Sequence, residues 1–344
     1  MANYEITVTK TEKSKLEEVD FNNLPFGHTF SDHMFICDYA DGKWQQPRIV
    51  PFGNLTMHPA SNVLHYGQAI FEGMKAFRLE EGGVTLFRPE MHAKRINASA
   101  RRLCMPDFPE DLFGQAVKQL VELDQDWTPG FADSSLYIRP YMLGVDGYLG
   151  VKASSTYQMI IFTCPVGPYY AEPVTLVTAQ NFVRAVKGGT GEAKAAGNYA
   201  ASLLPMRKAN EAGYDQVMWM DAHEFKYIQE VGTMNLFFVI GDTVVTPATD
   251  GAILKGITRN TFLHILKDKG IKVEERAITI DEVMEAYDNG ELKEIFGSGT
   301  AAVVSHVAEL THQGKKMVLP AIEERKIGNM LKADLNDIRT GKVE

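Results

Sequence analysis

A short segment rich in proline and glycine, residues 165–173, most constrains how this chain can fold. It holds three prolines and one glycine in nine positions. Proline lacks a backbone N–H, and glycine has a conformationally flexible backbone. Neither a helix nor a strand is therefore expected to continue through this segment. The chain of 344 residues is long enough for two domains that each bury a core. We therefore expect a smaller N-terminal domain over residues 1–165, a linker over residues 166–173 and a larger C-terminal domain over residues 174–344.

Hydrophobic patterning predicts both helices and strands on each side of this linker. Apolar residues recur at helical spacing over residues 110–124, and residues 158–164 form an apolar run typical of a buried strand. Helices and strands do not alternate strictly along the chain, so we expect an α/β fold built of α+β layers. On the C-terminal side the patterns predict strands over residues 174–178, 216–220, 225–230 and 236–240, and helices over residues 199–212, from about Thr258, and from Thr279 to about Gly290.

Charge and cysteine usage exclude several classes of protein. The net charge of -9 argues against nucleic acid as a partner. The three cysteines are widely spaced and odd in number, which indicates neither a disulfide framework nor a zinc site. The histidines, His92 among them, are scattered without metal-ligand spacing, so we expect no metal and a structural or surface role for each. With no signal peptide and no long apolar stretch, we expect a cytoplasmic protein without a membrane partner.

Lys194 lies between two groups of glycines, within residues 188–199, and this segment carries the strongest chemical signal. Glycine permits close backbone approach and unusual dihedral angles where a ligand or a tight turn needs room. A lysine held in such a setting can lose its proton and attack a carbonyl group. The alternative is an exposed lysine on a flexible loop. Lys194 is not part of a Walker A loop, because no glycine directly precedes it and no serine or threonine follows it.

Pyridoxal phosphate is one cofactor that a nucleophilic lysine serves, and the chain holds candidates for its other requirements. Gly256 and Thr258 stand where a helix begins, and an N-terminus of a helix favours a phosphate. Residues 297–301 are a small-residue segment that is interpreted as an anion-binding loop, with the Thr300 hydroxyl as one of its donors. Glu230 lies between two apolar runs and would face the pyridine nitrogen, and Tyr199 would reach the phenolic oxygen. Ordinary alternatives stay open for these positions: a plain helix start, a tight turn, a solvated glutamate and a core tyrosine.

Six ordered motifs together resemble the branched-chain amino acid aminotransferases of fold type IV, the class that also holds D-amino acid aminotransferase and aminodeoxychorismate lyase. The resemblance extends from about Leu24 to Pro320, and it implies a two-domain fold and pyridoxal phosphate as the cofactor. The motifs are residues 26–34, Leu64-His65-Tyr66, residues 71–77, residues 136–140, residues 230–235 and residues 296–301.

The resemblance implies a role for each matching position. Lys194 matches the family's Schiff-base lysine, which also moves the proton between the substrate Cα and the cofactor. Glu230 matches the partner of the pyridine nitrogen, and Tyr199 the partner of the phenolic oxygen. The implied phosphate-binding residues are Arg95, Ile257, Thr258 and Thr300. The implied substrate-binding residues are Thr233 and Ala301 at the carboxylate, Phe26, Tyr66, Phe71, Tyr137 and Arg139 in the side-chain pocket, and Leu149 and Val151 contributed by the other subunit.

The implied reaction is a ping-pong exchange of the amino group between L-leucine, L-isoleucine or L-valine and 2-oxoglutarate, in a homodimer. Aromatic and aliphatic walls suit the branched side chains. Tyr137 and Arg139 would receive the second carboxylate of glutamate or 2-oxoglutarate. The alternatives are a D-amino acid aminotransferase or lyase of the same fold, or a non-catalytic phosphate- or nucleotide-binding module using the glycine-rich segments.

Overall fold

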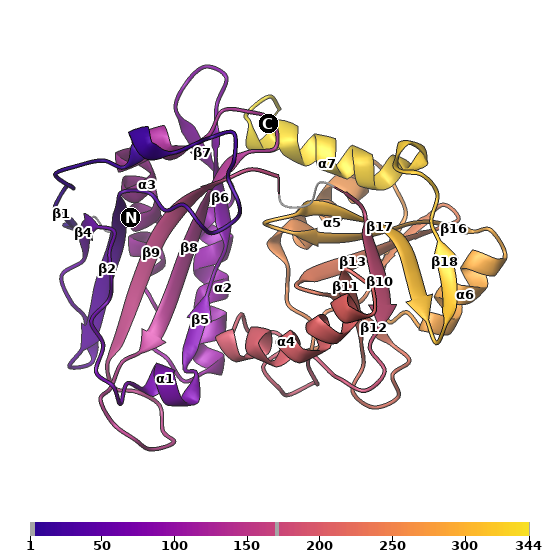
Figure 1. Cartoon of the computed structure of the whole chain (residues 1–344), viewed down its shortest axis with the longest axis horizontal. Coiled ribbons are helices and arrows are strands. Elements are labelled where there is room, and N and C mark those ends of the chain that lie inside the picture. The colour runs from indigo at the N-terminus through magenta and orange to yellow at the C-terminus, as the bar shows by residue number, and fades with distance from the viewer. Residues whose placement is uncertain (1–3, 169–171, 344) are drawn as a thin grey trace. The chain divides into compact units, whose positions relative to one another are not determined.

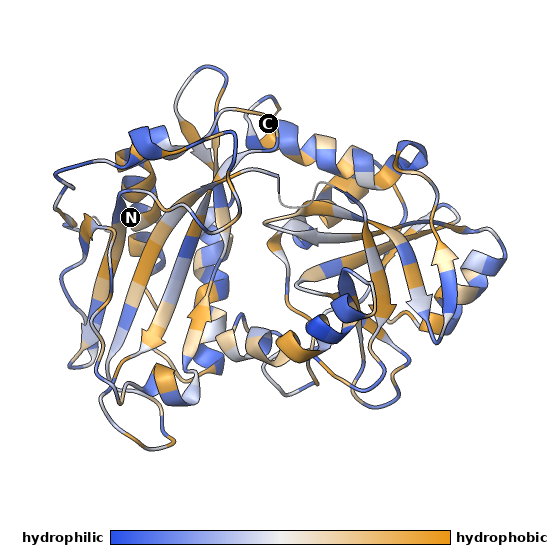
Figure 2. Cartoon of the chain, viewed as in Figure 1, coloured by the Kyte–Doolittle hydropathy of each residue, from blue (hydrophilic) through white to orange (hydrophobic). Residues whose placement is uncertain are grey.

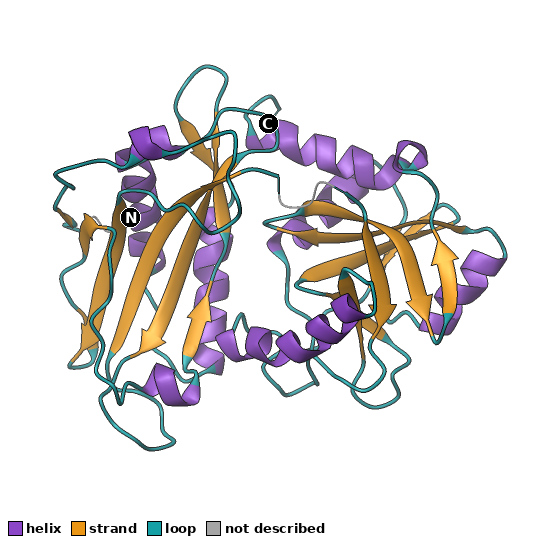
Figure 3. Cartoon of the chain, viewed as in Figure 1, coloured by secondary structure: helices purple, strands orange, loops and turns teal. Residues whose placement is uncertain are grey.

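The structure is a computed structural model that describes residues 4–168 and 172–343 (Figure 1). Contacts divide the chain into two compact units. The first comprises residues 1–169, 193–197 and 338–344, and the second comprises residues 170–192 and 198–337. Each unit combines helices with strands, as Figure 3 shows. The expected linker contains residues 169–171, which lie outside the described residues, and the expected domain limits stay a prediction.

The first unit is built on one nine-stranded sheet. Its strands are β1 (Thr7–Val8), β2 (His33–Ala40), β3 (Lys43–Trp44), β4 (Arg48–Pro51), β5 (Ala69–Phe71), β6 (Met74–Arg78), β7 (Val84–Leu86), β8 (Ser135–Gly144) and β9 (Tyr157–Val166). The main path runs β1-β4-β2-β9-β8-β6-β7, with β3 beside β2 and β5 beside β8. The long strands β8 and β9 pair antiparallel over their full lengths, so they form the rigid centre of the sheet.

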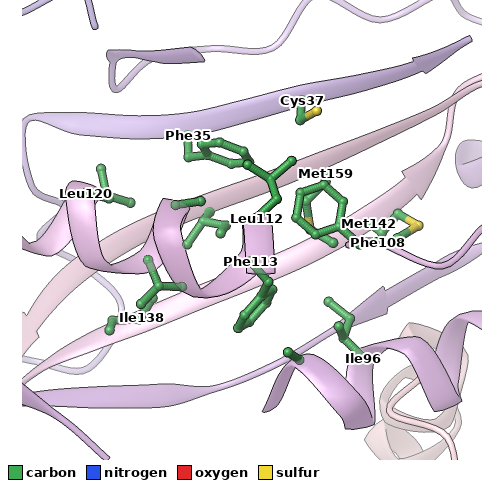
Figure 4. Close-up of a cluster of buried hydrophobic side chains, with 14 of the residues drawn as sticks. Phe35, Cys37, Ile96, Phe108, Leu112, Phe113, Leu120, Ile138, Met142 and Met159 are labelled. Atoms are coloured by element: carbon green, nitrogen blue, oxygen red, sulfur yellow. The ribbon is translucent and has the colours of Figure 1, made fainter. Parts of the chain in front are cut away.

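The two longer helices of the first unit, α2 (Pro89–Arg102) and α3 (Glu110–Leu123), bury apolar side chains against this sheet. The short helix α1 (Asn62–Tyr66) does not, since Leu64 and Tyr66 are exposed. The helix predicted over residues 110–124 is confirmed, and the six apolar positions that define its periodic face are all buried. Figure 4 shows Leu112 and Phe113 of α3 in one cluster with Phe35 of β2. Burial of apolar side chains is the main force that holds a helix on a sheet.

The second unit is built on another nine-stranded sheet. Its strands are β10 (Val174–Thr178), β11 (Gln216–Met220), β12 (Ile228–Val231), β13 (Met234–Ile240), β14 (Thr243–Thr246), β15 (Val273–Glu275), β16 (Leu292–Gly299), β17 (Val303–His312) and β18 (Lys315–Val318). The neighbours run β12-β11-β10-β17-β16-β13-β14-β15, and β12 pairs with β13 as well. This additional pairing closes six of the strands into a ring, a barrel-like sheet that leaves no open edge there. The strands of both sheets carry long apolar stretches in Figure 2.

Four further helices follow Lys194 in the sequence: α4 (Ala196–Glu211), α5 (Ile257–Asp268), α6 (Ile280–Asp288) and α7 (Lys326–Arg339). The start predicted for α6 is confirmed, because Thr279 is its N-cap and accepts a hydrogen bond from the backbone N–H of Glu282. Helix α4 begins three residues earlier than predicted, directly after Ala195 leaves its bridge to Ile70. Across the described residues, no helix has the length and apolar character needed to cross a bilayer.

Three predicted boundaries are wrong, two because strand pairing continues past the predicted limit and one because a side chain holds a local turn. β9 continues through Pro165 and Val166, since its pairing with β2 ends at Phe162 and the missing N–H of Pro165 costs no bond in that pairing. β12 begins at Ile228, because the carboxylate of Asp221 accepts the backbone N–H groups of residues 223, 224, 226 and 227 and holds them in a turn. Residues 297–299 are the end of β16, whereas the sequence predicted a loop: Gly297 and Ser298 pair with both β13 and β17, and Gly299 pairs with β17.

Candidate active site

Lys194 is half-buried, and its backbone is fixed on both sides within the first unit. Its N–H donates to Ser99 Oγ at 2.9 Å, and its carbonyl accepts the N–H of Phe71 at 3.0 Å. Its Nζ lies 4.7 Å from the centre of the Phe71 ring. Lys194 is therefore held against β5 and α2, which excludes the alternative of an exposed lysine on a flexible loop.

Four of the predicted substrate-binding side chains gather beside Lys194. The guanidinium of Arg139 lies 4.7 Å from the Phe71 ring and 5.3 Å from the Tyr137 ring, and its Nη2 donates to the Tyr137 hydroxyl at 3.1 Å. Phe26 packs edge-on against Tyr137 with ring centres 5.0 Å apart. A Cβ at Gly73 would overlap the Tyr137 hydroxyl, so only glycine leaves room for this ring. The first unit thus places a cation against aromatic walls.

Arg95 of α2 forms a side-on ion pair with Glu72, a residue that sequence reasoning missed. Arg95 Nε donates to Glu72 Oε1 at 2.7 Å, and Arg95 Nη2 donates to Oε2 at 2.8 Å. His92 Nδ1 lies 2.7 Å from the same Oε2. The carboxylate of Glu72 is fully buried. The expectation that His92 has only a structural or surface role took no account of this cluster.

Charge compensation within this cluster sets its protonation states. Burial alone would raise the pKa of Glu72, but the charge and hydrogen bonds of Arg95, helped by His92, bring the pKa well below its ordinary value. Burial lowers the pKa of His92, against the opposing effect of Glu72. The cluster therefore holds an ionised Glu72, a charged Arg95 and a neutral His92 that donates its Nδ1–H.

Glu230 lies on β12 of the second unit and is buried, which rules out the solvated glutamate considered as an alternative. Arg184 Nη2 lies 2.6 Å from Glu230 Oε2, and Asn235 Nδ2 donates to Oε1 at 2.9 Å. Sequence reasoning assigned the pyridine nitrogen as the cation that Glu230 needs, and it missed Arg184. A buried carboxylate requires such a partner in the absence of any ligand.

Strand register places Ser298 on the same face as Glu230. Glu230 pairs with Asn235 across β12 and β13, and Asn235 pairs with Ser298 across β13 and β16. Residues directly opposite one another in antiparallel strands project to one face of the sheet. Within the described part of the chain, the buried Oγ of Ser298 has no hydrogen-bond partner. This face fits a polar aromatic cofactor, since it offers a compensated carboxylate and a hydroxyl that lacks a partner.

The N-terminus of α5 has the features of an anion site. Gly256 is the N-cap and supplies no side-chain acceptor to the first N–H groups, while Ile257 and Thr258 are buried in the first turn. A Cβ at Gly256 would overlap Asn235 Oδ1, so glycine is required where the helix meets the Glu230 cluster. Thr258 is therefore not the cap, contrary to the ordinary helix start considered as an alternative.

The remaining predicted residues of the second unit are placed on turns or on α4. Thr300 and Ala301 form the turn between β16 and β17 and are half-buried. Thr233 is exposed in the tight turn between β12 and β13. Tyr199 is half-buried on α4.

Known proteins match this chain across most of its length. Residues 69–310 match the family described as Amino-transferase class IV. The branched-chain-amino-acid transaminase 1 of Bacillus subtilis (strain 168) is 49% identical over 333 residues, covering 95% of this chain and 94% of that protein. The chain belongs to the class IV aminotransferases, in the branched-chain aminotransferase family. This aminotransferase is thus an enzyme, and the alternative of a non-catalytic phosphate-binding module is set aside.

Solved structures extend the similarity of this aminotransferase to its fold. The branched-chain aminotransferase from Thermoproteus uzoniensis, crystallised with norvaline, aligns with a TM-score of 0.74 and 26% identity over 90% of this chain and 96% of that one. A second branched-chain amino acid aminotransferase, complexed with N-(5'-phosphopyridoxyl)-L-glutamate, aligns with a TM-score of 0.72 and 26% identity, covering 89% of this chain and 95% of that one. The predicted fold type IV architecture is confirmed.

Three predicted substrate-binding residues of this aminotransferase stand apart from the aromatic cluster. Tyr66 at the end of α1 is exposed, as are Leu149 and Val151 in the segment between β8 and β9. Val151 retains 91% of its accessible surface and Leu149 retains 62%. Apolar side chains this exposed contribute no wall to a site within their own unit.

Proposed function

We propose that this aminotransferase transfers the amino group of L-leucine, L-isoleucine or L-valine to 2-oxoglutarate by a ping-pong exchange. The observation that carries the proposal is the position of two cationic groups on one aromatic ring. Lys194 Nζ and the Arg139 guanidinium each lie 4.7 Å from the centre of the Phe71 ring. An aromatic wall suits a branched side chain, and a guanidinium beside it suits the second carboxylate of glutamate. One pocket can therefore accept both substrates.

Pyridoxal 5'-phosphate is the cofactor that we propose. It supplies an electron sink for negative charge that develops at the substrate Cα. Roles taken from the resemblance assign Lys194 as its attachment residue, Glu230 to the pyridine nitrogen and Tyr199 to the phenolic oxygen. The phosphate would be held by Arg95, Ile257, Thr258 and Thr300. Support comes from the compensated Glu230 face and from the N-terminus of α5 without a side-chain cap.

The named ligand of a solved relative supports both the cofactor and the second substrate. That relative is complexed with N-(5'-phosphopyridoxyl)-L-glutamate, in which the cofactor skeleton is joined to glutamate. For this chain we propose that Thr233 and Ala301 bind the substrate α-carboxylate and that Arg139 and Tyr137 bind the side-chain carboxylate of glutamate. The Nζ of Lys194 would remove the proton from the substrate Cα. Because its backbone is held by Ser99 and Phe71, that nitrogen has a restricted range of positions.

We propose a homodimer as the active unit. Tyr66, Leu149 and Val151 are exposed although the resemblance assigns them to the substrate pocket. In the proposed dimer, Leu149 and Val151 complete the pocket of the other subunit. Removing large apolar side chains from water favours such an association. The cytoplasmic location expected from the sequence stays a prediction.

A lysine substitution tests the proposed function. Lys194→Ala should lower the rate of transamination from L-leucine to 2-oxoglutarate by about a thousandfold or more, since it removes the group that moves the proton. The visible absorbance of lysine-bound cofactor should vanish as well. Lys187→Ala, an exposed lysine seven residues earlier, is the matched control and should keep both signals. A Lys194→Ala enzyme with a near wild-type rate would show that the assignment is wrong.

The same assay separates the remaining alternative within the fold. L-leucine and D-alanine are each offered with 2-oxoglutarate, and the formation of glutamate is followed. We expect turnover of L-leucine only. Turnover of D-alanine alone would favour the D-amino acid aminotransferase.

A further inference from the structure

We propose that Glu72 and His92 are positioning residues that hold the guanidinium of Arg95 in the orientation from which it binds a phosphate monoester dianion. The inference rests on the proposed function, in which Arg95 binds the cofactor phosphate. In that proposal neither Glu72 nor His92 has a part. Both act through Arg95, and neither is expected to touch the phosphate.

The contacts of Glu72 determine the plane of the guanidinium. Its two carboxylate oxygens accept Arg95 Nε at 2.7 Å and Nη2 at 2.8 Å. Two parallel bonds between planar groups fix orientation as well as distance. The pair therefore fixes the Nε–Nη2 edge of the guanidinium. Because Glu72 is fully buried on the segment between β5 and β6, water does not compete for this edge.

His92 fixes the carboxylate in turn. Its Nδ1 lies 2.7 Å from Glu72 Oε2, and the backbone N–H of Gly73 donates to the same oxygen at 3.3 Å. A neutral imidazole donates one hydrogen bond without adding a second positive charge beside Arg95. The carboxylate therefore has fixed donors on both oxygens, and its own rotation is blocked. Arg95 is therefore paired with a carboxylate that is itself held in one orientation.

One face of α2 connects this cluster to the reactive lysine. His92, Arg95 and Ser99 follow one another at intervals of three and four residues, which places them on one side of the helix. Ser99 Oγ accepts the backbone N–H of Lys194. The helix that presents Arg95 thus also holds the backbone of Lys194. The Glu72 pair acts on the side chain of Arg95, whereas Lys194 is held by a separate contact of the same helix.

A free arginine side chain samples many rotamers, and binding a ligand costs the entropy of ordering them. An arginine already clamped by Glu72 and His92 has lost that freedom on folding. Phosphate binding should therefore depend on the clamp, whereas binding of the cofactor ring should not. This difference separates positioning from a merely structural role, in which both would suffer alike.

The test compares two ligands that differ only by the phosphate. Binding of pyridoxal 5'-phosphate and of pyridoxal to the cofactor-free enzyme is measured by absorbance titration. Glu72→Gln should raise the Kd for pyridoxal 5'-phosphate by about tenfold or more and that for pyridoxal by less than about twofold. His92→Leu should produce a smaller loss of the same kind, and His92→Asn, whose amide nitrogen can take the position of Nδ1 and donate, should restore most of the affinity. Asp107→Asn is the matched control, because Asp107 pairs with Arg101 of the same helix at 2.6 Å in an exposed position.

Two further variants show whether Glu72 acts through Arg95. In an Arg95→Gln background, Glu72→Gln should cause no additional loss of phosphate-specific affinity. If Glu72→Gln does not fold, Glu72→Asp keeps the charge with a shorter reach and should show the same selective loss. Equal losses for both ligands, or tighter binding of pyridoxal 5'-phosphate by Glu72→Gln, would overturn the inference. A wild-type enzyme that does not prefer pyridoxal 5'-phosphate, or an unchanged preference in Arg95→Gln, would instead overturn the phosphate-binding role of Arg95 in the proposed function.

Discussion

At the scale of single residues, this enzyme compensates each buried carboxylate of its candidate site with an arginine that is distant in sequence. Glu72 pairs with Arg95, and Glu230 pairs with Arg184. Removing one partner of such a pair leaves an uncompensated buried charge, which is far more costly than the pair itself. Arg139 differs from these arginines. It lies against the rings of Phe71 and Tyr137, and its described contacts include no ion pair with a carboxylate, so its charge is available to a ligand.

Arg139 should therefore discriminate between the two proposed substrates. Arg139→Met keeps a long apolar side chain against the rings and removes only the charge. We expect the half-reaction with L-glutamate to slow by about tenfold to a hundredfold, the value of a hydrogen-bonded charge, and the half-reaction with L-leucine by less than about threefold. Single-turnover kinetics with each substrate measure this ratio. Equal losses in both half-reactions would make Arg139 a structural residue.

At the scale of elements, helix termini decide where several site residues lie. The N-cap of α5 is Gly256, which leaves its first N–H groups open to a ligand. The N-cap of α6 is Thr279, whose hydroxyl accepts the N–H of Glu282. The side chain of Glu282 does not complete the capping box but pairs with Arg276 at 3.0 Å. Thus the N-terminus of α6 has a side-chain cap, whereas that of α5 has none.

Loss of the α6 cap should destabilise the second unit without affecting chemistry. Thr279→Ala removes the acceptor for the N–H of Glu282, so the free energy of unfolding should fall by about 1 kcal/mol. Thr279→Ser keeps the acceptor and serves as the control. Chemical denaturation followed by circular dichroism measures the difference, with kcat for L-leucine measured in parallel. A Thr279→Ala enzyme as stable as Thr279→Ser would refute the assigned cap.

At the scale of the whole molecule, exposed apolar side chains point to assembly. We expect a particle of twice the 38.3 kDa mass of one chain in light scattering. Val151→Asp should weaken the dimer and lower activity, because a charge replaces an apolar contact in the proposed interface. Val318→Asp changes another exposed valine, on β18, and should alter neither property. A fully active monomer would contradict the proposed dimer.

Stability of the fold should also depend on pH through His306 of β17. Burial lowers the pKa of His306 to about 4, aided by the charges of Arg325 and Lys332 and opposed by a hydrogen bond to Asn329. The unfolded chain binds a proton near pH 6.5, whereas the folded chain does not until about pH 4. The contribution of the neutral His306 to the free energy of unfolding is therefore fully present above pH 6.5. It is lost as the pH falls toward 4, by up to about 3 kcal/mol.

A matched substitution isolates this contribution. His306→Gln cannot take up a proton, so the melting temperature of the variant should fall less than that of the wild type between pH 7.5 and pH 4.5. Differential scanning calorimetry at the two pH values provides the comparison. If the melting temperatures of the variant and the wild type fall equally between the two pH values, the pH dependence arises from other groups.

The sequence by itself determined local structure and the residue types available for chemistry in this enzyme. Periodicity alone located α3 and its buried face, and the pair Thr279 and Glu282 marked the start of α6. Motif order indicated the family, and the glycine-rich segment around Lys194 made it the candidate reactive lysine. These features are readable because helix period, capping and motif spacing depend only on residues close together in the chain.

Only the tertiary structure decided which distant side chains meet. The ion pairs of Glu72 with Arg95 and of Glu230 with Arg184 depend on how segments distant in sequence pack together, and the pairing of Asn235 with Ser298 depends on strand register. A shift of register by one residue would turn each strand side chain to the opposite face. Local sequence patterns do not specify the register, because it is set by the burial of whole sheet faces during folding. Lys194 could therefore be proposed from the sequence, whereas the contacts of Glu72 with Arg95 and His92 could not.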